Sequence, residues 1–445
     1  MNNIHIIGAG LAGCEAAWQA GGMGVPVRLY EMKPDKKSPV HTSGQFAELV
    51  CSNSLGSGRL SNASGLLKEE MRRLGSLIVE AADAAAVPAG GALAVDREAF
   101  SGYITRKITE NPHIEIVREE VMDFSRFGND LIVVATGPLT SGPLLSAIAE
   151  LTGSKMLHFF DASAPIVSAE SINMDKVFRA SRYGRGDDYL NCPMTGEEYE
   201  AFYHALVSAE CAQVREFENN VFEGCMPVEV MAGRGYQTLL FGPLKPKGMT
   251  DPKTGREPFA VVQLRQEDSR GTMYNLVGFQ THLKWGEQKR VFGMIPGLEN
   301  AEFLRCGVMH KNAFIQSPKL LDNHYRMLEH KNIWFAGQIT GVEGYMESTS
   351  SGLLAGLSAA CAALGKEPPC LSASTAIGAL AAHISNKSVV NFQPMNINYG
   401  IMEPCGQRIK DKEKKNLNIA ERSLEEIRCL REQRSLLSAR TGDAR

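Results

Sequence analysis

Apolar runs and a glycine-rich turn alternate over the first thirty residues of the chain. The run "IHII", residues 4–7, predicts a short buried strand, and "GAGLAG" follows it directly. The next residues, "CEAAWQA", favour a helix, and "VPVRLYE", residues 25–31, predicts a second strand. This order of strand, glycine turn, helix and strand is typical of an α/β fold with a parallel sheet.

Three glycines in the turn have the spacing of a dinucleotide site. Gly8, Gly10 and Gly13 form G-x-G-x-x-G between the predicted strand and helix. Such glycines let the chain turn tightly, let the backbone approach a pyrophosphate and let the helix pack close to the strand. Glu31 ends the second strand eighteen residues after Gly13, where a carboxylate can bind ribose hydroxyls. We therefore predict a dinucleotide site.

Two later segments indicate which dinucleotide binds. "LIVVATGP", residues 131–138, predicts a buried strand, and residues 332–356 predict a strand, a glycine loop and a helix of small residues. Both resemble the later fingerprints of the glutathione-reductase-like FAD domain, in which the chain returns to the first sheet after a long insertion. A single glycine is equally typical of a turn, but the order and separation favour FAD. The resemblance implies FAD contacts for Gly137, Gly337, Gln338 and Gly352.

The pattern changes over residues 166–310. Residues 195–217 have apolar positions at near-helical spacing, and Thr195 and Glu198 predict a capping box at the start of that helix. Extended segments are predicted for "QTLLFGPL", "FAVVQLRQE" and "MYNLVGFQT", and residues 245–258 predict an exposed basic loop. This interval therefore indicates a mixed α/β insertion.

The predicted fold class is α/β, with a discontinuous glutathione-reductase-like FAD-binding Rossmann domain and a smaller mixed α/β insertion domain. We place the first part of the FAD domain at residues 1–165, the insertion on the substrate side at 166–310, and the second part of the FAD domain at 311–445. No second G-x-G-x-x-G follows a strand. A nicotinamide is therefore expected to enter the cleft that other substrates use, and not a domain of its own.

Composition and charge narrow the class of protein. The chain has 445 residues, 44% of them hydrophobic, and no apolar run as long as a membrane span. Its N-terminus lacks the basic segment of a secretory signal, so we expect a cytoplasmic protein. Ten cysteines without a C-x-x-C argue against disulfides and a zinc ribbon, and no metal site is expected. A net charge of −3 neither supports nor excludes an RNA partner.

The tail, residues 406–445, has eleven Lys or Arg against seven Asp or Glu, and much of it favours a helix. Three interpretations of the tail stay open: a segment that binds phosphates, a solvated amphipathic helix and a frayed end. The mixed charge does not favour any one of them.

Two cysteines lie where regular structure is expected to end. Cys51 follows an apolar run and precedes a Ser/Asn/Gly turn, while Cys225 lies between Gly224 and the Met-Pro pair that ends at Pro227. Free cysteine is more often a small buried hydrophobe than a reactive group. However, a thiolate can attack C6 of a pyrimidine, and a second group must then remove the C5 proton. Two cysteines in one cleft would divide these roles.

Long stretches of the chain resemble the bacterial folate- and FAD-dependent tRNA (uracil-5-)-methyltransferases, the small relatives of the glucose-inhibited division protein family. They include "IIGAGLAGCEAAWQ", "ELVCSNSL", "FEGCMPVEVMA", "VGFQTHLKWGEQKRVF" and "FAGQITGVEGYMESTSSGLLAG". The resemblance implies transfer of a one-carbon unit from 5,10-methylenetetrahydrofolate to C5 of the T-loop uridine of tRNA, with FAD as cofactor and NAD(P)H as reductant. The family's two essential cysteines map onto Cys51 and Cys225.

We assign Cys225 as the nucleophile toward uracil and Cys51 as its base or proton-transfer partner, and the reverse assignment stays open. Tyr345, which follows a glycine of the later flavin fingerprint, is a candidate for stacking on the flavin or folate ring.

The chain departs from the family pattern at two positions. Gly56 and Gly293 stand where the family usually has arginine, so phosphate or folate-glutamate recognition is expected to be weaker. Three alternatives therefore stay open: the same chemistry on ribosomal RNA, flavin-dependent modification of a tRNA wobble uridine, and a flavoprotein that binds RNA without catalysis.

Overall fold

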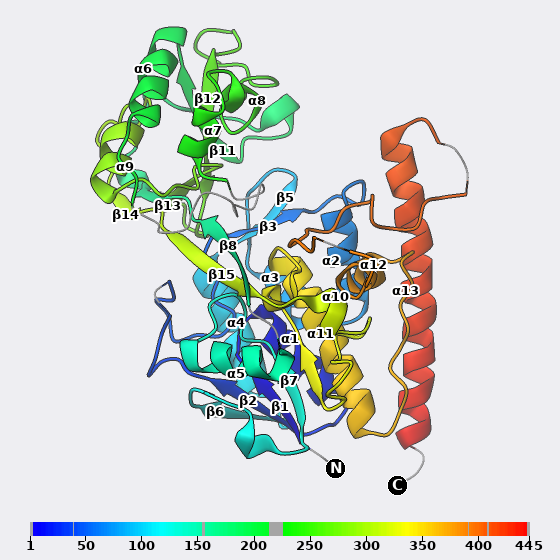
Figure 1. The fold of residues 1–445 in the computed structure, drawn as a ribbon. Coiled ribbons are helices and arrows are strands. Elements are labelled where there is room, and N and C mark those ends of the chain that lie inside the picture. Colours follow the sequence, from blue (N-terminus) through cyan, green and yellow to red (C-terminus); the bar gives the residue numbers. More distant parts are fainter. Residues whose placement is uncertain are drawn as a thin grey trace.

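The first sheet of the computed structural model is parallel and has five strands in the order β16-β7-β1-β2-β6 (Figure 1). The structure describes residues 3–38, 40–153, 156–212, 226–389, 391–406 and 409–442. The strands are β1 Ile4–Ile7, β2 Val27–Glu31, β6 Ile114–Arg118, β7 Leu131–Val134 and β16 Ile333–Phe335. Strands from both ends of the chain therefore form one sheet, as the sequence predicts.

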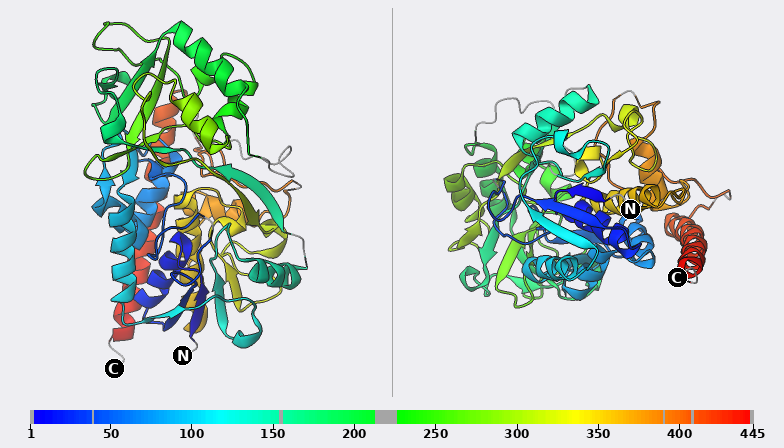
Figure 2. Two further views of the ribbon diagram at one scale, coloured as in Figure 1. Left: turned by 90° about the vertical axis from the view of Figure 1, so that its left-hand side faces the viewer. Right: turned by 90° about the horizontal axis from the view of Figure 1, so that it is seen from below.

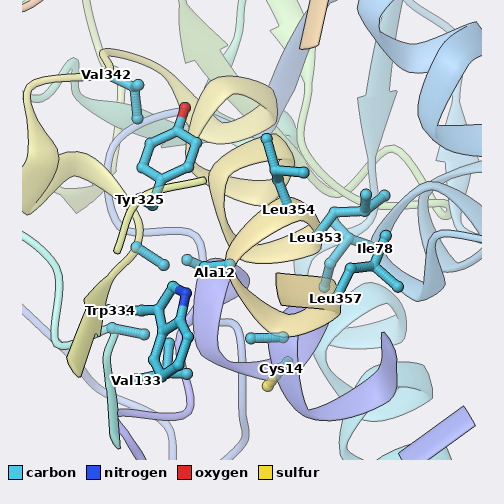
Figure 3. Packing of buried hydrophobic residues seen from close by; sticks show 14 of the residues in the cluster. Ala12, Cys14, Ile78, Val133, Tyr325, Trp334, Val342, Leu353, Leu354 and Leu357 are labelled. Atoms are coloured by element: carbon cyan, nitrogen blue, oxygen red, sulfur yellow. The ribbon is translucent and has the colours of Figure 1, made fainter. Parts of the chain in front are cut away.

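Two helices pack against this sheet and against each other at glycines. Helix α1 is Leu11–Gly22 and helix α11 is Tyr345–Ala363. A Cβ atom at Gly352 would lie 2.2 Å from the carbonyl oxygen of Ala12, and one at Gly356 would lie 2.5 Å from that of Ala16. Only glycine lets the two backbones approach so closely. Figure 3 shows the apolar core at this crossing, with Ala12, Cys14 and Leu353 among its residues.

Further elements surround the parallel sheet. A three-stranded antiparallel sheet is formed by β3 Ser54–Ser57, β5 Ala92–Val95 and β4 Ala86–Val87. The helices are α2 Ala63–Arg73, α3 Leu77–Ala84, α4 Arg97–Thr109, α5 Gly142–Thr152, α10 Ser317–Leu320 and α12 Ala376–Ile384, with short 3₁₀ turns at Ser125–Phe127 and Gln338–Thr340.

The second large sheet is antiparallel and lies at the other end of the molecule (Figure 1). Its six strands follow the order β10-β11-β12-β13-β9-β14, with a separate hydrophobic core. A two-stranded ribbon, β8 Leu157–Ala162 with β15 Met309–Phe314, connects it to the first sheet. The strands are β9 Ile166–Ser168, β10 Phe178–Arg179, β11 Tyr189–Met194, β12 Ala260–Gln266, β13 Met273–Leu276 and β14 Phe303–Arg305. The helices are α6 Gly196–Val207, α7 Val228–Gly233, α8 Thr238–Phe241 and α9 Trp285–Phe292, with 3₁₀ turns at Ala169–Ser171 and Arg182–Gly184.

The sequence predicts most of this insertion correctly. Helix α6 begins with the expected capping box, in which Thr195 and Glu198 bond each other's backbone N–H groups. The helix ends at Val207, earlier than expected, and residues 213–225 lie outside the described part of the chain. The extended segment expected at residues 237–244 is wrong, because helix α8 forms there and buries Leu239. The domain boundaries themselves stay a prediction.

The C-terminal segment is a docked amphipathic helix. Helix α13, Lys412–Gly442, runs along one flank of the molecule next to α2 (Figure 2). Its side chains Ile419, Leu424 and Ile427 are buried against the rest of the protein, and its Asn416 Nδ2 donates to Ser61 O at 2.9 Å. Of the three alternatives for the tail, the structure supports the amphipathic helix over residues 412–432. Across the residues that the structure describes, no helix is both long and apolar enough to cross a membrane.

Candidate functional site

A cavity opens at the carboxyl ends of β1, β2 and β7, beside the N-terminus of α1. Its empty space, including the solvent at its mouth, is about 1140 Å³. Ligands of open α/β sheets bind at this edge, where the helix N-terminus presents free N–H groups. Its lining includes Gly8, Gly10, Glu31, Gly137, Gly337, Gln338 and Tyr345.

The three N-terminal glycines differ in what they do. Gly8 has a φ of +100°, and a Cβ there would lie 2.7 Å from Ala135 O. Gly13 packs against the turn itself, since a Cβ would lie 1.8 Å from Gly8 O. A Cβ at Gly10, in contrast, would meet no heavy atom within 4 Å and would face open space. Gly10 therefore leaves room for a ligand, whereas Gly8 and Gly13 allow the tight turn.

Glu31 is buried and organises the glycine turn. One carboxylate oxygen accepts from Ala9 N at 2.9 Å and the other from Lys33 N at 2.9 Å. A carboxylate has about four lone-pair positions, so each oxygen keeps acceptor capacity for a hydroxyl. The predicted ribose contact is thus compatible with the geometry, and Glu31 also has a structural role.

The C-terminal candidates follow β16, and Gly337 lies close to Ala12 of α1. Gly337 has a φ of +86°, and its N–H donates to Ser351 Oγ at 2.6 Å. Gln338 lines the cavity and donates to the carboxylate of Glu343. Gly352 does not line it, because this glycine lies at the crossing of α11 with α1. The structure therefore gives Gly352 a packing role in place of the predicted cofactor contact.

The lining also contains residues that the sequence did not indicate, among them Lys33, His41 and Glu48. Lys33 Nζ donates to Gln45 O and lies 3.7 Å from Glu48 Oε2. Burial and the nearby Lys33 lower the pKa of His41. Their only sequence signal is a position soon after the strand that ends at Glu31.

Cys51 lies beside this cavity, in a segment without regular structure. Its N–H donates to the Tyr345 hydroxyl at 2.8 Å, and the N–H of Ser52 donates to the same oxygen at 3.3 Å. Arg97 donates to the carbonyls of Leu49 and Cys51, and Arg305 donates to that of Val50 at 2.6 Å. The apolar run before Cys51 does not form a strand, contrary to expectation. Its backbone carbonyls accept hydrogen bonds from the arginine side chains and not from a neighbouring strand.

The Cys51 thiol is half-buried and protonated at neutral pH. Burial raises its pKa, as do the carboxylates of Asp161 and Glu343, while Arg97 and Arg305 oppose the shift. Sγ donates to Ala162 O at 3.6 Å. Burial and the adjacent Asp161 also raise the pKa of Glu343, to about 8. Cys51 can therefore hold and pass on a proton, but it must ionise before it can accept one.

The insertion sheet forms hydrogen bonds with the residues that follow Cys51. Arg265 on β12 donates to Asn53 Oδ1 at 2.8 Å and to Ser52 Oγ at 2.7 Å. Asn53 Nδ2 returns a hydrogen bond to Gln266 O at 2.9 Å. The residues after Cys51 thus join the insertion sheet to the cavity of the parallel sheet.

Cys225 lies outside the described residues, but both flanks of its segment are described. Ala212 N donates to His282 O at 2.8 Å, and Val228 N donates to Gln280 O at 2.7 Å. Thr281, which lies between Gln280 and His282, donates its N–H to Ser163 O at 3.2 Å. Ser163 directly follows Ala162, whose carbonyl accepts from the Cys51 thiol. Both flanks of the Cys225 segment are therefore bonded to residues 280–282, an irregular segment that also contacts the Cys51 surroundings.

A cluster of donor atoms includes His282 of the same irregular segment. Cys211, Glu229 and His282 place one sulfur, oxygen or nitrogen each within 4.8 Å of one another. Glu229 already accepts from Thr281 Oγ1 and His282 N, both at 2.8 Å, and contacts His282 Nδ1. Two protein donors and the His282 ring therefore already contact this carboxylate.

The two departures from arginine have local causes. Gly56 has a φ of +79°, and a Cβ would lie 2.7 Å from Ser64 Oγ. Gly293 ends α9, and a Cβ would lie 2.7 Å from Lys289 O. Neither position accepts a side chain without a local shift.

Comparisons with known proteins place the chain in a family. Residues 3–367 match the family model described as glucose inhibited division protein A. A protein of Acetivibrio thermocellus named methylenetetrahydrofolate--tRNA-(uracil-5-)-methyltransferase TrmFO is 62% identical over 95% of this chain and 97% of its own. A Listeria monocytogenes protein of the same name is 56% identical over 97% and 99%.

A solved structure supports the fold. Aquifex aeolicus GidA superposes with a TM-score of 0.71 at 17% identity, covering 98% of this chain and 75% of GidA. The resemblance predicted from the sequence is confirmed. The chain belongs to the glucose inhibited division protein A family and, within it, to the methylenetetrahydrofolate--tRNA-(uracil-5-)-methyltransferases.

Proposed function

We propose that this chain transfers a one-carbon unit from 5,10-methylenetetrahydrofolate to C5 of the T-loop uridine of tRNA, forming ribothymidine. The names of its relatives supply the folate donor, the tRNA acceptor and the uracil C5 position. The observation that carries the proposal is the bond from Cys51 N to Tyr345, because Tyr345 also lines the dinucleotide cavity. A tRNA substrate also leads us to place the protein in the cytoplasm.

The cavity suits FAD as the resident cofactor. Gly10 leaves space for the pyrophosphate at the start of α1, and Glu31 keeps lone pairs for ribose hydroxyls. Gly337 and Gln338 lie near Tyr345 and hence near Cys51. Bound FAD, reduced by NAD(P)H, would supply the reducing equivalents that complete the methyl group. The chain itself must orient the uracil, exclude water and move protons.

The two cysteines divide the covalent work. The Cys225 thiolate adds to C6 of uracil, and the electrons of the C5–C6 double bond make C5 nucleophilic toward the one-carbon unit. The C5 proton then passes to a base while the bond between the one-carbon unit and the folate nitrogen breaks, so that tetrahydrofolate leaves. A hydride equivalent, which bound reduced FAD would supply, completes the methyl group, and the C5–C6 double bond re-forms as the thiolate leaves. To accept that proton Cys51 must first ionise, and the positive charges of Arg97 and Arg305 favour its thiolate.

Mass analysis of tRNA tests the reaction. The purified protein, loaded with FAD, is incubated with unmodified tRNA, methylenetetrahydrofolate and NADPH. Ribothymidine at the T-loop position is expected, and omission of folate is expected to abolish it. Intact FAD without any ribothymidine would refute the methyltransferase proposal. A product in ribosomal RNA or at the wobble position alone would identify one of the alternative substrates.

The cysteine roles require a separate experiment. RNA with 5-fluorouridine at the target position cannot lose a C5 proton, so the covalent adduct to C6 should accumulate. The adduct is expected to survive Cys51→Ala and to disappear with Cys225→Ala, as followed by denaturing gel electrophoresis. The opposite pattern would reverse the assignment. Cys192→Ala, a buried thiol on β11 distant from the cavity lining, is the matched control.

A further inference from the structure

A buried glutamate at the end of the insertion strand has no task in the proposed reaction. Glu267 follows β12, and only 1% of its side chain is exposed. It pairs with Arg97, whose Nε lies 2.6 Å from Glu267 Oε2. Burying an ion pair costs desolvation energy that the pairing often fails to offset, so a buried pair is weak evidence for stability alone.

Arg97 connects that glutamate to the peptide of Cys51. Its Nη1 donates to Leu49 O, and its Nη2 donates to Cys51 O at 3.3 Å. The guanidinium is planar with donors at fixed angles, so an acceptor on one edge orients the other edges. Glu267 on the insertion side therefore fixes where the positive charge lies relative to the thiol.

The thiol is surrounded by charges of both signs from separate elements. Arg97 is the strongest influence that lowers the pKa of Cys51, and Glu267 is not among its direct major influences. Among the residues that the structure describes, the charged or titratable groups that face Cys51 are Asp161 at the end of β8, Glu343 before α11, Arg97 at the start of α4, Arg265 on β12, Arg305 at the end of β14 and Tyr345 at the start of α11.

We propose that Glu267 is a positioning residue for Cys51, which holds the Arg97 guanidinium against the Cys51 peptide and limits the positive charge felt by the thiol. The proposal rests on the proposed function only for the task of Cys51. Neutralising Glu267 leaves Arg97 uncompensated and favours the thiolate. Removing Arg97 takes away the strongest positive charge that opposes Asp161 and Glu343, and so disfavours the thiolate.

Alkylation of Cys51 tests the proposal on the full chain without RNA or folate. The rate of reaction with iodoacetamide is measured between pH 7 and 10 by mass spectrometry of the Cys51 peptide, since only the thiolate reacts. Glu267→Gln is expected to react about threefold faster, and Arg97→Gln about tenfold slower, because an opposite charge at this range shifts a pKa by roughly one unit or more.

The alkylation rate is expected to rise in Glu267→Gln and to fall in Arg97→Gln. A loosened structure would instead raise the rate in both variants, so the two rates together distinguish a charge effect from loosening. Glu267→Asp keeps the charge and should react at the wild-type rate. Glu299→Gln, which removes a surface partner of Lys176 beside the same sheet, is the matched control and should leave the rate unchanged. Equal rates for wild type and Glu267→Gln, or faster alkylation of both Gln variants, would overturn the proposal.

The pair Glu267→Gln and Glu267→Asp decides the outcome even if Arg97→Gln does not fold. Because no methyl transfer is measured, a chain that shows these rates but forms no ribothymidine would refute the proposed function and leave the role of Glu267 intact.

Discussion

Individual residues around the cavity separate into those that shape the chain and those that leave space. Gly8 and Gly13 are required by the turn, whereas a Cβ at Gly10 would meet no heavy atom within 4 Å. Its φ of −76° and ψ of −169° are accessible to any residue. A glycine that neither the conformation nor the packing demands is best explained by a ligand that approaches its backbone.

Replacing Gly10 should therefore impair cofactor binding without unfolding the protein. Gly10→Ala is expected to lower FAD occupancy at least about tenfold, because a Cβ would occupy the space of the pyrophosphate. Flavin absorbance relative to protein absorbance measures occupancy, and circular dichroism checks the fold. Gly22→Ala at the end of α1 also meets no atom within 4 Å and is the control. Full flavin content in Gly10→Ala would contradict this explanation.

Among the elements, helices α2, α12 and α13 are joined by one buried carboxylate. Glu70 on α2 accepts from Ala376 N at 2.7 Å and Ile377 N at 2.9 Å, at the start of α12, and from the Ser423 hydroxyl on α13. Burial raises the pKa of Glu70 to about 7. The C-terminal helix is thus attached to the nucleotide-binding part through a group that titrates near neutrality.

This carboxylate should make stability fall as the pH rises. Below about pH 4.5 Glu70 is protonated in both the folded and the unfolded protein. Between pH 4.5 and 7 it ionises in the unfolded protein but stays protonated in the folded one, so the free energy of unfolding falls as the pH approaches 7. Each pH unit corresponds to about 1.4 kcal/mol, giving at most about 3 kcal/mol. Urea unfolding at pH 5 and 7.5 should show a smaller pH dependence for Glu70→Gln.

Glu69→Gln, which removes the exposed neighbour paired with Arg72 and Arg73, is the control and should behave like the wild type. An identical pH dependence for Glu70→Gln and the wild type would show that Glu70 does not titrate in this range.

At the scale of the whole molecule, the two large sheets meet at the Cys51 segment. Arg265 from the insertion and Tyr345 from α11 bind adjacent residues of the same stretch. The catalytic candidate is consequently positioned by both parts of the chain at once. A ligand bound in either part can change the surroundings of the thiol through these contacts.

Breaking the insertion-side contact should loosen the segment locally. Arg265→Met keeps the bulk but removes the donors to Ser52 and Asn53, leaving buried acceptors that cost about 1–3 kcal/mol each. Amide hydrogen exchange is expected to accelerate at residues 51–57 and to stay unchanged in β1 and β2. Arg179→Met, which removes a bond to Tyr274 within the same sheet, is the control. Unchanged amide exchange at residues 51–57 would show that the hydrogen bonds of Arg265 are not needed to order this segment.

The sequence by itself determined the elements that depend on neighbouring residues. Apolar runs specify β1, β7 and β16, glycine spacing specifies the turn at Gly8, and the Thr195–Glu198 box specifies the start of α6. The same local rules failed at residues 237–244, where burial of Leu239 in the insertion core favours a helix over the extended form. The family and its reaction could be predicted because long motifs carry them.

Only the tertiary structure decided which residues surround Cys51. Arg97 and Arg305 lie 46 and 254 positions further along the chain, and Glu267 directly follows β12 of the insertion sheet. No local pattern indicates that their charges face one thiol. Gly352 likewise has the sequence context of a cofactor contact, yet it lies where two helices cross. Periodicity and spacing act between near neighbours, whereas electrostatics and packing act between groups that only the folded chain brings together.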